Sequence, residues 1–137
     1  MTTLLLRLAG VGQLVLIVGS LAIPKMLGWQ QDTQKLQPLT RQVFWTYAGY
    51  IWATNLCFGL LSTFAPEWLL DGSPLSIAVA GYIAAYWLAR VLIQFFYFDR
   101  SAAPEGKLFV LGEWALVGLF VGLTGTYGWV VWRGLAG

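Results

Sequence analysis

The stretch Tyr82-Ile-Ala-Ala-Tyr86-Trp-Leu-Ala-Arg90-Val-Leu-Ile-Gln94 decides the fold, because it places a permanent cation inside an otherwise apolar segment. A guanidinium at the centre of a membrane helix costs about 2.5–3.5 kcal/mol on insertion scales. Another side chain is therefore needed as a partner for the Arg90 guanidinium. The best candidate is Glu113, which lies in the next apolar segment along the chain.

The composition is that of a protein that lies in a bilayer. Of the 137 residues, 58% are hydrophobic and only 10% are charged, whereas soluble domains carry about 25% charged residues. The mean hydropathy of +0.70 agrees with this environment. We expect a single transmembrane domain over residues 1–137, with no second, soluble domain.

Four apolar stretches are each long enough to cross a hydrocarbon core of about 30 Å as helices. They must be helical, because lipid offers no partner for an unpaired backbone group. The short connections at 65–74 and 99–107 predict an all-α membrane protein, an antiparallel bundle of four transmembrane helices. A short surface helix is expected at 30–37. The expected spans are 4–23, 42–64, 75–98 and 108–132.

The Lys and Arg residues outside these spans predict the orientation in the membrane. Only Arg7 and Arg133 lie near the two termini, whereas five others lie in the connections after the first and third spans. The side richer in cations is the cytoplasmic one. Both termini are therefore expected outside the cytoplasm. The five cations are Lys25, Lys35, Arg41, Arg100 and Lys107.

Polar side chains recur every four residues on the third span, at Tyr82, Tyr86, Arg90 and Gln94. They form one stripe along the helix, and such a stripe is expected to face protein or a hydrated cavity. A rise of 1.5 Å per residue places Arg90 about 12 Å, and Glu113 about 8 Å, from the same boundary. The two side chains can therefore meet.

Asn55 on the second span and Gln13 on the first lie near mid-depth, each about 14 Å from the outer boundary. We predict one polar level made of these two residues with Arg90 and Glu113. Two interpretations stay open. Arg90 and Glu113 form a structural ion pair between the third and fourth spans, or the cluster binds an anionic or amphipathic ligand or holds a proton-linked carboxylate.

Small residues indicate where membrane helices approach one another closely. The fourth span contains Gly118-Leu-Phe-Val-Gly122 and then Gly125, and the third contains Ser76, Ala80 and Ala84. We expect both stripes to pack inside the bundle. A contact with a second copy of the chain is the alternative.

Several chemistries lack the residues that they need. The chain has no His and one Cys, Cys57, so a haem held by His, a zinc or copper site and an intrachain disulfide are not expected. We expect no metal and no cofactor. The absence of a His base, a phosphate-binding loop and a carboxylate pair within one span predicts a protein without enzymatic activity. The net charge of +2 with scattered cations predicts no nucleic-acid partner.

The pattern Leu-x-Pro38-Leu-x-Arg41-Gln-x-Phe44-Trp-x-Tyr47, with Trp87-x-x-Arg90 and Gln94-Phe-Phe-Tyr-Phe-Asp99, resembles a group of small uncharacterised bacterial four-helix membrane proteins. The resemblance covers nearly the whole chain and implies the fold and a bacterial inner membrane, but no activity. The first helix, ending Ile23-Pro-Lys25-Met-Leu-Gly28-Trp29, also resembles the opening of the DoxX-like family.

These observations predict a non-enzymatic, multi-pass protein of the inner membrane, an accessory, scaffolding or lipid-associating component. Its expected partners are membrane lipids and a larger membrane complex or a second copy of the chain. The alternative is a small transporter or a binder of hydrophobic or anionic ligands. The polar site in question, structural or ligand-binding, is made of Arg90, Glu113, Asn55, Tyr86, Gln94, Tyr82 and Gln13.

Overall fold

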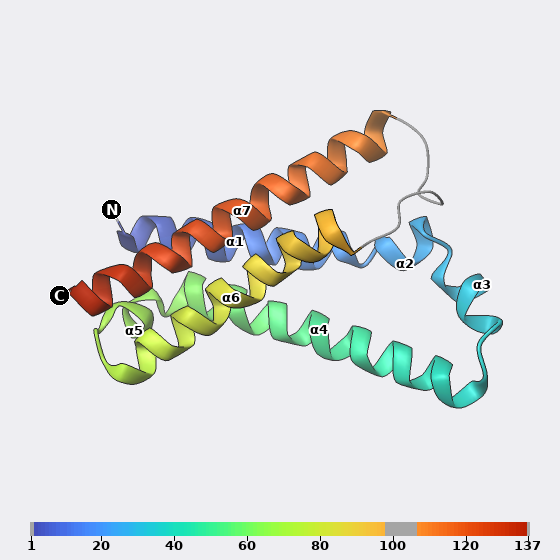
Figure 1. Cartoon of the computed structure of the whole chain (residues 1–137), viewed down its shortest axis with the longest axis horizontal. Coiled ribbons are helices and arrows are strands. Elements are labelled where there is room, and N and C mark those ends of the chain that lie inside the picture. The colour runs from blue at the N-terminus through green and yellow to red at the C-terminus, as the bar shows by residue number, and fades with distance from the viewer. Residues whose placement is uncertain (1, 98–106, 137) are drawn as a thin grey trace.

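A computed structural model of the chain describes residues 2–97 and 107–136. These residues form seven helices and no strand (Figure 1). Each of the four apolar stretches contributes one long helix, and three short helices lie in the connections. The helices are α1 (Thr2–Ser20), α2 (Ile23–Met26), α3 (Trp29–Gln34), α4 (Pro38–Phe64), α5 (Pro66–Leu70), α6 (Pro74–Phe96) and α7 (Lys107–Ala136).

Local signals explain where the helices begin. Helices α4, α5 and α6 each start at a proline, whose fixed φ suits the first turn and whose missing N–H is not needed there. Before α6, Asp71 accepts a hydrogen bond of 2.8 Å from the amide of Ser73, and the Ser73 side chain accepts one from the amide of Ser76. The bond to the Ser73 amide lowers the pKa of Asp71.

The long helices are arranged as two close pairs, α1 with α4 and α6 with α7, and α1 also meets α7. Consecutive long helices run in opposite directions. They converge at the end that holds both termini and α5, and they spread apart toward α3 (Figure 1). The third connection, including Arg100, lies outside the described residues.

The buried core lies in the converged half of the molecule. Residues 38–57 of α4 contain no buried side chain, whereas α5 closes the converged end with the buried Leu69. Trp87 of α6 stacks on Phe120 of α7 at 5.2 Å between ring centroids. The apolar core consists of Leu6, Ala9, Phe58, Leu69, Ala80, Ile83, Trp87, Phe120, Leu123, Tyr127 and Val130.

Helices α1 and α4 approach backbone to backbone at two glycines. A Cβ added to Gly10 would lie 2.6 Å from the backbone nitrogen of Thr63 and 2.9 Å from the carbonyl oxygen of Gly59. A Cβ added to Gly59 would lie 2.9 Å from a methyl group of Leu14. Real Cβ atoms do not come this close to backbone atoms, so the crossing depends on glycine at position 10, whereas the contact at position 59 is with the flexible end of the Leu14 side chain.

Within residues 2–97 and 107–136, three helical segments are long and apolar enough to cross a membrane: α1, α6 and residues 110–136 of α7. Helix α4 is longer than α1, but Tyr, Trp, Thr and Asn side chains lower its hydropathy. The described part of the chain is therefore helical, and three of its helices have the length and apolarity of membrane spans.

The predicted inward packing of the glycine stripe on the last long helix is wrong. Gly118, Gly122 and Gly125 are exposed, and nothing described lies within 4 Å of a Cβ added to any of them. Helix α7 instead buries the face that carries Phe120 and Tyr127, because these larger side chains fill the space against α6 and α1. The prediction for α6 is confirmed at Ser76 and Ala80, which are buried, and Ala84 is partly buried.

We expect Gly10→Ala to destabilise the protein by about 1–3 kcal/mol, because the new methyl group meets backbone atoms of α4 that cannot move aside. Gly49→Ala is the matched control. Gly49 also lies inside a long helix, but a Cβ there meets nothing within 4 Å, so the substitution should be neutral or stabilising by up to about 1 kcal/mol. Thermal unfolding in detergent measures both. Equal melting temperatures for the two variants would contradict the close crossing.

Candidate functional site

A fully buried amide, that of Gln13, lies where the four long helices meet. Its Nε2 donates hydrogen bonds to the Tyr127 hydroxyl at 2.7 Å and to the carbonyl oxygen of Ala9 at 3.2 Å. Its Oε1 accepts a hydrogen bond of 3.2 Å from Nε1 of Trp87. The Tyr127 hydroxyl is also hydrogen-bonded to the Ser62 side chain. We call Gln13, Ser62, Trp87 and Tyr127 the Gln13 network.

The Gln13 network takes one side chain from each of α1, α4, α6 and α7. Both donors of the Gln13 amide are used, and its oxygen accepts one bond, so little capacity remains for a ligand. A hydrogen bond between membrane helices contributes about 0.6 kcal/mol on average, whereas a buried group that loses its partner costs about 1–3 kcal/mol. The network therefore fixes the register of the four helices.

The predicted level that joined Gln13 to Arg90, Glu113 and Asn55 is wrong for Gln13. Its described hydrogen-bond partners are Tyr127, Trp87 and the backbone of α1. The rise per residue gives the depth of the backbone only. Tyr and Trp side chains are long and lean toward the N-terminal end of their helix, so their polar atoms lie at a different depth from their backbone.

Arg90 is partly buried between α6 and α7. Its Nη1 donates a hydrogen bond of 3.3 Å to Oε1 of Gln94, one turn further along α6. Its guanidinium carbon lies 5.1 Å from the centroid of the Phe120 ring, and Phe120 stacks on Trp87. A desolvated cation–π contact contributes about 2 kcal/mol, which offsets much of the cost of placing the guanidinium at this depth.

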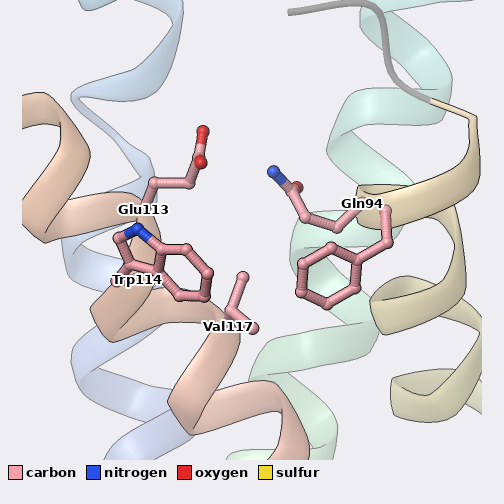
Figure 2. A pocket seen from close by; sticks show the side chains of 5 residues that line it. Gln94, Glu113, Trp114 and Val117 are labelled. Carbon is pink, nitrogen blue, oxygen red and sulfur yellow. The ribbon is translucent and has the colours of Figure 1, made fainter.

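Glu113 and Gln94 face one another across a small hollow between α7 and α6 (Figure 2). The volume of about 60 Å³ leaves room for a few water molecules. Gln94 therefore has two roles, because it accepts from Arg90 and lines the same hollow as Glu113. The direct pairing of Arg90 with Glu113 stays a prediction. The hollow is lined by Gln94, Phe95, Glu113, Trp114 and Val117.

Asn55 and Tyr86 extend this group toward α4. The Tyr86 hydroxyl interacts with the Asn55 side chain and with the charge of Arg90. The Oδ1 atom of Asn55 is buried and has no hydrogen-bond partner among the described residues. We call Asn55, Tyr86, Arg90, Gln94 and Glu113 the Arg90 cluster.

The predicted inward stripe on α6 is wrong for Tyr82, which is 61% exposed. Four residues turn a helix through about 400°, so a stripe at four-residue spacing winds by about 40° at each step. Over the three steps from Tyr82 to Gln94 it turns by about 120° and leaves the packed face. Tyr82 keeps one contact inward, because its ring meets the edge of Phe58 at 6.0 Å.

The Arg90 cluster offers a cation, a carboxylate and two side-chain amides, which suit binding more than bond breaking. Within residues 2–97 and the described part of α7, no three His, Cys, Asp or Glu side chains converge as a metal site would require. The described cysteine, Cys57, is exposed on α4. Neither the cluster nor Cys57 is arranged as a nucleophile with a base.

We expect Tyr127→Phe to lower the free energy of unfolding by about 1–3 kcal/mol, because it leaves Gln13 and Ser62 without a shared partner. Tyr82→Phe is the matched control, since it removes a hydroxyl from an exposed tyrosine and keeps the ring contact with Phe58. Unfolding in mixed detergent micelles, followed by tryptophan fluorescence, compares the two. If Tyr82→Phe lowered the free energy of unfolding as much as Tyr127→Phe does, the result would contradict the Gln13 network.

Comparison with protein-family models, with curated proteins and with solved structures found no match. What the chain does is therefore inferred from its own side chains and surfaces.

Proposed function

We propose that the chain is a four-helix protein of the bacterial inner membrane that has no enzymatic activity and acts as an accessory or scaffolding component. The observation that carries this proposal is the closed Gln13 network. Its four side chains hydrogen-bond one another at the centre of the molecule, so the deepest polar groups serve to hold helices together. A transport path or a catalytic centre would need such groups to be open to a substrate.

The contacts of α4 with α1 support α4 as the fourth span. The two helices cross at Gly10 and Gly59, and the indole Nε1 of Trp52 donates a hydrogen bond of 3.2 Å to the carbonyl oxygen of Ile17. Gly10 lies at the middle of α1 and Ile17 near its C-terminal end, so α4 follows α1 over seven residues, or about 10 Å of depth. Its 27 residues extend for about 40 Å, which exceeds a hydrocarbon core of about 30 Å. Arg41, near its start, is its one charged residue.

Cysteine labelling tests the fourth span and the orientation together. In a Cys57→Ala background, Glu67→Cys follows α4 and Lys35→Cys precedes it, and both native side chains are exposed. We expect a membrane-impermeant maleimide to label Glu67→Cys in intact cells and Lys35→Cys only after the membrane is disrupted. If α4 did not cross, the two positions would react alike. Labelling of Lys35→Cys alone in intact cells would show the opposite orientation.

The outward face of α7 supports a role in assembly. Ala115, Gly118, Gly122, Gly125 and Trp129 follow one another at spacings of three and four residues, and all are exposed. A lipid chain gains little from a groove of small residues, whereas a second helix can approach it closely and gain van der Waals contact. We call these five residues the α7 glycine face.

A photo-crosslinking amino acid in place of Trp129 tests the assembly role in native membranes. Leu88 on α6 is the control position, because both side chains are 48% exposed. We expect protein crosslinks from position 129 and not from position 88, and we expect Gly122→Leu to remove them by filling the groove. Crosslinks that persist in Gly122→Leu, or that form equally at both positions, would contradict a helix partner on the α7 glycine face.

A small transporter or a ligand binder is the second candidate, and the Arg90 cluster favours it. The hollow beside Glu113 and the unsatisfied Oδ1 of Asn55 are polar features at depth that packing alone does not require. The hollow is small, about 60 Å³ in volume, so a ligand much larger than a few waters would extend beyond it or move α6 and α7 apart. Native mass spectrometry after mild detergent extraction distinguishes the candidates, because a bound molecule lost in Glu113→Gln would favour this one.

A further inference from the structure

A polar pocket lies at the elbow where α3 turns into α4. It is a shallow, widely open depression with a volume of about 210 Å³. It is smaller than the roughly 300–1,000 Å³ of pockets for drug-sized ligands, so it suits a small polar group. We call it the elbow pocket, and it is lined by Gln30, Thr33, Gln34 and Arg41.

The elbow pocket offers hydrogen-bond donors that the protein does not use. Within the described residues, no ion pair or side-chain hydrogen bond involves the Arg41 guanidinium or the amides of Gln30 and Gln34. Thr33 is different, because its buried hydroxyl donates to the carbonyl oxygen of Trp29 at 2.7 Å and forms the floor. One cation and two amides are thus left to face a ligand, which favours an anion with several oxygens.

Three aromatic rings place the elbow pocket at the membrane interface. Trp29 meets Phe44 at 5.2 Å and Trp45 at 6.1 Å, all edge to face, and so joins α3 to α4. Tryptophan side chains gather at the level of the lipid headgroups. Arg41 precedes Trp45 by four residues, or about 6 Å along α4, which puts its charge just outside the rings. Lipid phosphates lie at that level.

The rest of the elbow suits a membrane surface. Lys25, Lys35 and Arg41 supply three positive charges against the single carboxylate of Asp32. Such a cationic segment attracts anionic lipids, and the planar fork of an arginine matches phosphate oxygens.

We propose that the elbow pocket binds the phosphodiester headgroup of an anionic glycerophospholipid. Arg41 pairs with the phosphate, Gln30 and Gln34 donate to its oxygens or to the headgroup hydroxyls, and the aromatic rings lie beside the upper part of the acyl chains. The site requires that α4 enters the bilayer at the elbow, which the cysteine labelling tests separately. It does not depend on the scaffolding role.

Native mass spectrometry of the full chain tests the site by counting lipids retained during titration with phosphatidylglycerol or phosphatidylcholine. We expect one phosphatidylglycerol to bind at a much lower lipid concentration than further copies do. For phosphatidylcholine, the first copy should bind no more tightly than the later ones. Arg41→Gln should weaken the first binding event about tenfold more than Lys35→Gln, which removes the same charge from the same segment outside the pocket. Gln34→Leu should weaken it severalfold with no change of charge.

Three outcomes would overturn the proposal. If Arg41→Gln and Lys35→Gln lowered the affinity for the first phosphatidylglycerol equally, the attraction would be diffuse. In that case each surface cation contributes about fivefold to the affinity. Equal affinity for phosphatidylglycerol and phosphatidylcholine would exclude selection of an anionic lipid. Displacement of the lipid by millimolar inorganic phosphate or glycerol phosphate would assign the pocket to a soluble phosphate. Thermal unfolding shows whether Arg41→Gln folds. If it does not, Gln34→Leu still tests the site, because it removes a pocket amide without changing the charge.

Discussion

An amide buried in a hydrocarbon environment must find partners inside the protein, and this constraint shapes the centre of the molecule. The amide of Gln13 finds its partners because α6 and α7 bring Trp87 and Tyr127 close to it. The Tyr127 hydroxyl is in turn hydrogen-bonded to Ser62 of α4. Sliding one helix by a residue would break at least one of these bonds. Apolar packing between membrane helices tolerates such slips far better.

The position of Arg90 depends on the same centre. Its guanidinium lies over Phe120, Phe120 stacks on Trp87, and Trp87 donates to Gln13. The cation is thus held by an aromatic column that ends in the Gln13 network. Polar side chains therefore gather in three places: the Gln13 network, the Arg90 cluster and the elbow pocket.

The sequence was sufficient for the helices and insufficient for their faces. Apolar length and proline positions predicted the four long helices to within a few residues, because lipid allows little besides a helix. Residue spacing also found the polar groups of the third span. It could not tell that Tyr127 would meet Gln13, since that depends on side-chain reach and helix crossing. It also placed Gly118, Gly122 and Gly125 inward, because a stripe of small residues has the same sequence pattern whether it packs against a helix of its own chain or against another protein.

The most direct measurement is a double-mutant cycle between Gln13→Leu and Tyr127→Phe, read from unfolding free energies in lipid nanodiscs. These residues are far apart in the sequence, so coupling between them reports on the contact of α1 with α7. We expect a coupling of about 1 kcal/mol, within the range of interhelical hydrogen bonds in membranes. Additive effects of the two substitutions would contradict the claim that the Gln13 network holds the four helices in register.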